Sequence, residues 1–197
     1  MLTHEVCDNH LLVMLCSERE PGGVVLAKVY SCAVVGLDGV LVEVEVDVSQ
    51  GVPATVVVGL PDAAVRESQD RVRAAIRNSG GKFPVGRITV NLAPADLKKA
   101  GPTYDLPIAL GILIASNQVP HSEQLEDALV AGELSLDGVV RHIPGIIAMV
   151  STAVDKGMRR AFVPAVDAPE AAMVGEIEIV PVRTLAIVFH AGNRAAQ

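Results

Sequence analysis

Hydrophobic and charged residues alternate along VLVEVEVDVS (40–49), where valines from Val42 to Val46 are separated by carboxylates. A period of two predicts a strand with one buried and one exposed face. The apolar run VVLAKVYSCAVVG (24–36) precedes it across the turn Leu37-Asp38-Gly39, so the two runs predict a half-exposed hairpin. The next run, ATVVVGL (54–60), is apolar throughout and predicts a more buried strand, closed by Gly59 and Pro61.

A helical period follows over residues 62–78. Asp62 is placed to cap the first turn, and Ser79-Gly80-Gly81 ends the pattern. The predicted buried side consists of Val65, Val72 and Ile76. At about 100° per residue, three arginines fall within about 40° of one another on a different side. We call them the arginine stripe: Arg66, Arg73 and Arg77.

Strand and helix patterns then alternate to the end of the chain. Strands are predicted over 87–94, 127–136, 160–164 and 177–182, helices over 106–116 and 144–157, and a short turn over 169–173. An initial hairpin followed by this alternation predicts an α/β (α+β) fold, with helices packed on a mixed sheet.

The pattern also suggests limits for the folded unit. Residues 1–24 have no sustained period and end in Pro-Gly-Gly, so we expect an extension separate from the fold. Residues 25–184 are predicted to form one domain. Residues 185–197 begin like a helix, and we expect them to be a truncated linker or tail.

Composition and charge limit the kinds of protein that this chain can be. Half of the 197 residues are hydrophobic, which suits one sizeable domain, and 16 basic against 23 acidic residues give a net charge of −7. Contact with nucleic acid is therefore expected only locally. The cysteines, Cys7, Cys16 and Cys32, show no metal-binding spacing. With no secretory signal and no run long enough to span a bilayer, the sequence predicts a cytoplasmic protein without membrane contact.

The sequence contains no motif that predicts nucleotide binding. A phosphate-binding loop requires GxxxxGK[ST], and that string does not occur. Gly80-Gly81-Lys82 lacks both the earlier glycine and the hydroxyl residue. We therefore expect no ATP hydrolysis and no cofactor or metal site in this chain.

The arginine stripe has two interpretations. Arg66 with Asp70, and Glu67 with Arg71, are spaced four apart and could simply form ion pairs on a solvated helix. Alternatively, the stripe contacts a nucleic-acid backbone or another subunit.

Thr103 also has two interpretations. As a nucleophile it would need a base, and Lys98 and Lys99 are close in sequence. As a turn residue it would follow Gly101-Pro102, with Asp105 capping the next helix.

Three stretches carry a resemblance to a known family: LAKVYSCAVVGLDG (26–39), VVVGLPDAAVRESQDRVRAAIRNSGGKFPVGRITVNLAPADLKKAGPTYDLPIALGIL (56–113) and AGELSLDGVVRHIPG (131–145). They closely resemble the N-terminal domain of the ComM (YifB) family of magnesium-chelatase-like AAA+ ATPases. The resemblance covers about residues 26–185. It implies a fold like the Lon proteolytic domain, which is related to the second domain of a small-subunit ribosomal protein.

The resemblance implies roles for two residues. Thr103 matches the serine of the Gly-Pro-Ser turn in proteolytic Lon domains. Ile147 matches the catalytic lysine, and since isoleucine cannot accept a proton, the resemblance implies a lost catalytic dyad. The family further implies a hexameric DNA motor for branch migration during natural transformation, with ATP and Mg²⁺ bound in an ATPase domain that follows this one.

Other expectations remain open beside this one. A Ser/Thr peptidase would use Thr103 with Lys98, Lys99 or Lys156, and the family name also suggests a magnesium-chelatase subunit. Family members usually begin near LAKVYS, so residues 1–24 are expected to reflect an early start codon. The chain is expected to be a fragment, because its end no longer resembles the family.

Overall fold

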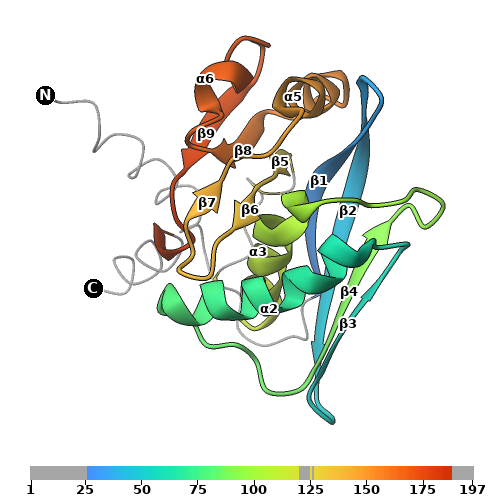
Figure 1. Cartoon of the computed structure of the whole chain (residues 1–197), viewed down its shortest axis with the longest axis vertical. Coiled ribbons are helices and arrows are strands. Elements are labelled where there is room, and N and C mark those ends of the chain that lie inside the picture. Colours follow the sequence, from blue (N-terminus) through green and yellow to red (C-terminus); the bar gives the residue numbers. More distant parts are fainter. Residues whose placement is uncertain (1–25, 120–124, 126, 188–197) are drawn as a thin grey trace, which may run out of the picture.

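A seven-stranded mixed sheet organises the computed structural model, which describes residues 26–119, 125 and 127–187 (Figure 1). The strand order is β3-β4-β2-β1-β5-β8-β9. Pairing is antiparallel for β1 with β2 and for β2 with β4, and parallel for the other neighbours. The strands are β1 (Ala27–Val35), β2 (Asp38–Ser49), β3 (Ala54–Val58), β4 (Arg87–Ala93), β5 (Ala128–Val130), β8 (Arg160–Pro164) and β9 (Glu178–Val182).

Helices cover the two faces of this sheet unequally. One core cluster joins α2 and α3 to one face along most of its width, and a second cluster joins α5 and α6 to the other face around β5 and β8. A separate hairpin, β6 (Glu133–Leu134) with β7 (Val140–Arg141), lies beside α2 and α3. The helices are α2 (Ala63–Asn78), the 3-10 turn η1 (Pro102–Tyr104), α3 (Asp105–Ala115), α5 (Ile146–Asp155) and α6 (Ala168–Ala171). The predicted fold class is confirmed.

The predicted β1–β2 hairpin is also confirmed. Val44 lies between Val29 of β1 and Leu92 of β4, and all three side chains are fully buried. The alternating carboxylates of β2 point to the opposite face, where Glu43 and Glu45 are only half-buried. The period of two therefore reports one covered and one open face.

Helix α3 lies between α2 and the sheet. All eleven of its residues are buried, as expected for a helix that is apolar on every side. Its Gly111 makes the close approach to the sheet possible, because a Cβ atom there would stand 2.5 Å from Cγ2 of Val46. The predicted helix at 106–116 is thus confirmed and occupies the centre of the larger core.

Two predictions about strands were wrong. The run ATVVVGL does not form a buried strand: β3 is half-buried at the edge of the sheet, because it pairs with β4 alone among the described strands. The single strand expected over 127–136 is divided into β5 and β6, which belong to different sheets.

The proposed domain limits fall partly outside the described residues. Residues 1–24 and most of 185–197 belong to the stretches that the structure does not describe, so the limits stay predictions. No helix among the described residues is long and apolar enough to cross a bilayer.

Candidate functional site

The turn Gly101-Pro102-Thr103 leads directly into α3 and is tied to the start of α2. Gly101 adopts a φ of 82°, which favours glycine. Its backbone N–H donates to Oδ2 of Asp62 at 3.2 Å, while Oδ1 of the same carboxylate accepts from Val65 N–H at 2.9 Å. Asp62 therefore caps α2, as predicted, and also holds the turn.

Thr103 is anchored through its backbone. Its carbonyl accepts a hydrogen bond from Gly132 N–H at 3.0 Å, and Leu106 N–H donates to the Gly132 carbonyl at 3.0 Å. The side chain is 6% exposed. Within the described residues the threonine hydroxyl has no hydrogen-bond partner, so the turn is held through its backbone and no described base is hydrogen-bonded to the hydroxyl.

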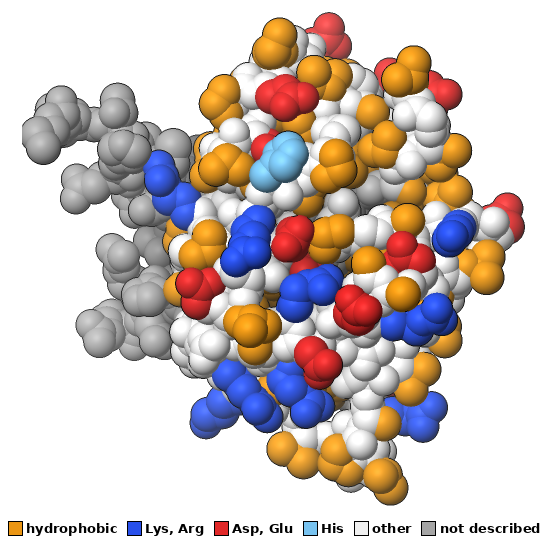
Figure 2. Space-filling model, viewed as in Figure 1, with side chains coloured by type: hydrophobic (Ala, Val, Ile, Leu, Met, Phe, Trp, Pro, Cys, Tyr) orange, Lys and Arg blue, Asp and Glu red, His pale blue; other side chains and the backbone are white. Residues whose placement is uncertain are grey.

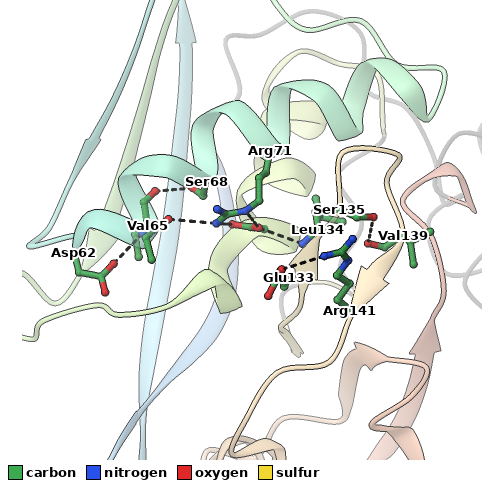
Figure 3. Close-up of polar contacts among 11 residues, drawn as sticks. Asp62, Val65, Ser68, Arg71, Glu133, Leu134, Ser135, Val139 and Arg141 are labelled. Carbon is green, nitrogen blue, oxygen red and sulfur yellow. Dashed lines mark hydrogen bonds and ion pairs between the residues drawn. The ribbon is translucent and has the colours of Figure 1, made fainter.

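The strongest polar contact of the site joins α2 to α3. Nε and Nη2 of Arg71 donate to Oδ2 and Oδ1 of Asp105 at 2.8 and 3.1 Å, and Leu134 N–H of β6 donates to Oδ2 at 3.2 Å (Figure 3). The predicted capping role of Asp105 was wrong. Asp105 is instead the first residue of α3, its N-cap is Tyr104, and its carboxylate faces Arg71 because three donors converge there.

Burial sets the protonation behaviour of this pair. The Asp105 side chain is fully buried, and the loss of hydration raises the pKa of Asp105 to about 6, against the opposing effect of Arg71. The hydrogen bond that Arg71 donates to Asp105 raises the pKa of Arg71. Arg71 also donates to the carbonyl of Ala64 at 3.3 Å. The pair therefore holds α2, α3 and β6 in one fixed arrangement.

The three lysines proposed as bases do not bind the Thr103 hydroxyl in the described part of the chain. Lys99 is fully buried, its amine donates to the carbonyl of Pro94, and burial lowers the pKa of Lys99. Lys98 is exposed, and Lys156 is exposed at the C-cap of α5. The Lys99 amine is thus engaged in a contact with the backbone rather than with Thr103.

Ile147 lies in the first turn of α5 and is 42% exposed. Helix α5 packs against the second core cluster, whereas the turn that holds Thr103 leads into α3, on the opposite face of the sheet. The proposed equivalence of Thr103 and Ile147 with a catalytic dyad stays a prediction.

The arginine stripe projects from an exposed side of α2, about 100° around the helix axis from the buried Val65, Val72 and Ile76. All three arginines are exposed, and none forms an ion pair with a described residue. The guanidinium of Arg73 lies over the ring of Phe83, 4.7 Å from its centre. Figure 2 shows this face of the molecule with basic side chains interspersed among acidic ones.

The ion pairs expected to neutralise this helix are not the ones that form. Arg71 binds Asp105 rather than Glu67, which affects the pKa of Arg71 only electrostatically. Arg66 makes no ion pair with Asp70 in the described structure. The positive charge of the stripe is consequently less neutralised by carboxylates of the same helix than the residue spacing predicted.

The Arg71–Asp105 pair was missed at the level of sequence. One signal was available: Arg71 stands three residues after Ser68 and four before Ala75, both buried, and so lies at the border of the buried face. A second signal was an aspartate at the start of an entirely apolar helix, which requires a partner when buried.

Comparison with known proteins places these features in a family. The family described as subunit ChlI of Mg-chelatase matches residues 44–167. Competence protein ComM of Haemophilus influenzae is 46% identical over 151 residues, covering 77% of this chain and 29% of its own. The uncharacterized protein YifB of Escherichia coli is 44% identical over 134 residues, covering 68% and 26% respectively.

Two further relatives extend the comparison. An uncharacterized protein of Mycobacterium tuberculosis is 47% identical over 160 residues, or 81% of this chain and 32% of that protein. A Lon protease of Trichlorobacter lovleyi is 26% identical over 160 residues, 75% of this chain and 19% of its own. The chain thus spans about a third or less of the length of these relatives. By the family match and these identities, the chain belongs to the magnesium-chelatase-like AAA+ family that includes ComM and YifB.

Proposed function

We propose that this chain is a non-catalytic Lon-like domain of a cytoplasmic, magnesium-chelatase-like DNA motor, and that its arginine stripe contacts the phosphate backbone of DNA. The observation that carries the proposal is the alignment along α2 of three exposed guanidiniums that form no ion pair with a described residue. The family resemblance adds a hexameric assembly, in which the domain guides DNA or helps the subunits to assemble. The relative named competence protein ComM is in line with a role in DNA uptake or recombination.

The stripe has the rigid support that such a contact needs. Val72 and Ile76 are buried on the inner side of α2, and the Arg71–Asp105 pair fixes the helix to its neighbours. The arginines therefore project in a constant direction with little backbone freedom to lose on binding. Each arginine that neutralises a phosphate releases counterions, which makes the affinity depend on salt.

The residues present do not fit a nucleotide or its metal ion. The sequence has no phosphate-binding loop. Among the described residues no group of three or more His, Cys, Asp or Glu side chains could hold a metal ion. ATP and Mg²⁺ are proposed to bind elsewhere in longer members of the family, and this chain is proposed to hydrolyse neither ATP nor peptides. A magnesium-chelatase subunit proper would need that same machinery.

The experiment compares two triple variants of the full chain. Arg66→Ala, Arg73→Ala and Arg77→Ala together remove the stripe, and the control removes three other exposed arginines, Arg87, Arg141 and Arg159. Duplex DNA binding is measured at several salt concentrations alongside oligomer mass. We expect the stripe variant to bind more weakly, with the log–log salt slope reduced by roughly three if each arginine contacts one phosphate.

Equal binding and equal salt slopes in the two triple variants would overturn the DNA contact. If mass changes while DNA binding does not, the stripe is a subunit contact instead. If neither changes, it is only a solvated helix face.

A Ser/Thr peptidase is the second candidate, because Lys99 is buried, has a lowered pKa and stands four residues before Thr103. Its amine is, however, engaged by the Pro94 carbonyl. Covalent labelling of Thr103 by an acyl-transfer probe, absent in Thr103→Ala, would favour the peptidase.

A further inference from the structure

The two outer strands of the seven-stranded sheet present very different edges. Strand β9 contains Pro181, which has no N–H to donate, and Glu178, which is bound to Arg160 at 3.0 Å. Proline and charge are common devices that prevent an edge strand from pairing with another chain. Strand β3 contains neither, since its sequence is ATVVV. As far as the described residues go, the β3 edge is therefore open to strand pairing in a way that the β9 edge is not.

Apolar side chains collect around this open edge. Residues 51–61, GVPATVVVGLP, contain no charged residue in a chain of net charge −7. Val52 is 83% exposed, Val58 42% and Leu60 56%. Ala54 N–H donates to the Gly86 carbonyl at 3.2 Å, which brings the 91% exposed Val85 close to the start of β3. Exposed apolar side chains beside an unblocked strand indicate a surface that another strand covers.

The edge is complementary to itself. In an antiparallel pair of two β3 strands centred on Val56, Ala54 lies opposite Val58 and Thr55 opposite Val57. Cross-strand pairs of β-branched residues stabilise sheets, and no like charges meet. Val52 and Leu60 each stand four residues from the centre, so the two exposed apolar residues flank both ends of the shared ladder.

We propose that β3 pairs with β3 of a second copy of this chain, antiparallel about Val56, and joins the two sheets edge to edge. The contact is isologous and closes with two copies, unlike the head-to-tail contact that builds a ring. It does not rest on the proposed DNA contact, because β3 and the arginine stripe are separate surfaces on separate elements.

The test uses charge at the proposed twofold axis. Val56 is half-buried on the face of the sheet that no described helix covers at this edge. Val56→Lys places two lysines opposite each other in the pair, and Val56→Glu places two carboxylates there. Mass is measured by sedimentation across a range of concentrations for each variant and for their equal mixture. Leu37→Lys is the control, since Leu37 is 93% exposed in the β1–β2 turn.

The unaltered chain and Leu37→Lys are expected to dimerise with rising concentration, each Val56 variant alone to stay monomeric, and the mixture to regain the dimer mass. A monomeric unaltered chain, a Val56 variant that still dimerises, or a mixture that fails to pair would each overturn the proposal. Thermal melts establish that the variants fold. Should the Val56 variants unfold, the double variant Ala54→Lys and Val58→Lys places lysine opposite lysine at both ends of the paired strands, with one of the two changes at the more exposed Val58. Its dimerising like the unaltered chain would also refute the contact.

Discussion

Helix α2 carries Arg71 and the arginine stripe within four turns, and the two behave as different kinds of residue. Arg71 is 23% exposed and gives two hydrogen bonds to the fully buried Asp105. The stripe arginines are exposed and have no ionic partner among the described residues. The difference shows that position relative to the buried face decides whether an arginine holds the fold together or is free to meet a partner.

The largest effect is expected from Arg71→Ala. Removing the guanidinium leaves the Asp105 carboxylate buried without its charge partner, which in other proteins costs about 3–5 kcal/mol. We expect a loss of this size in the free energy of unfolding at neutral pH, measured by urea denaturation. Arg66→Ala is the matched control on the same helix. If the free energy of unfolding falls by less than about 1 kcal/mol, Arg71 contributes no more to stability than an exposed ion pair does, and the contrast with the stripe fails.

The next effect is a pH dependence that belongs to Asp105. Its pKa is about 6 in the folded chain and 3.8 as the ordinary value. Since the folded state keeps the proton to the higher pH, this group stabilises the fold below pH 4 and loses that contribution as the pH rises through 6. The shift of about 2 units corresponds to about 3 kcal/mol.

Asp105→Asn removes this titration. The unfolding free energy of the unaltered chain, compared with that of Asp105→Asn, should therefore fall by up to about 3 kcal/mol between pH 4 and pH 7. Parallel pH profiles for the two proteins would show that the carboxylate does not titrate in this range. Urea denaturation at closely spaced pH values makes the measurement.

The smallest effects are expected in the stripe. Arg66→Ala and Arg77→Ala should change the free energy of unfolding by less than about 0.5 kcal/mol, as exposed substitutions usually do. Arg73→Ala also removes the contact with Phe83 and should cost about 0.5–1 kcal/mol. Thermal or urea unfolding separates the three. A cost above about 2 kcal/mol for Arg66 or Arg77, outside the usual surface range, would mean that the stripe is structural.

The sequence predicted those parts of the fold that depend on local pattern. The alternation in 40–49 identified the β1–β2 hairpin, and Asp62 with Gly80 marked the limits of α2. The strand at 54–58 was misjudged as buried, because apolar composition does not report whether a strand has one neighbour or two.

The site was less predictable, because its contacts join residues distant in sequence. Arg71 and Asp105 are 34 positions apart, and Asp62 and Gly101 are 39 apart. Pairing rules for residues three or four apart favoured Glu67 as the partner of Arg71. The buried carboxylate attracted the guanidinium instead, since a buried charge requires compensation more than an exposed one does.

The strand order of the sheet has a consequence for how the chain folds. Strands β1 to β4 occupy one side of the sheet, β5, β8 and β9 occupy the other, and the described pairing between the halves is Tyr30 with Leu129. Every strand of the first half precedes every strand of the second in the chain. The first half can therefore assemble from nearby segments, with a modest loss of chain entropy, before the second half adds to the free side of β1. In such an assembly β1 serves as the template for both halves, and β3 joins only after β4, which is its one neighbour among the described strands.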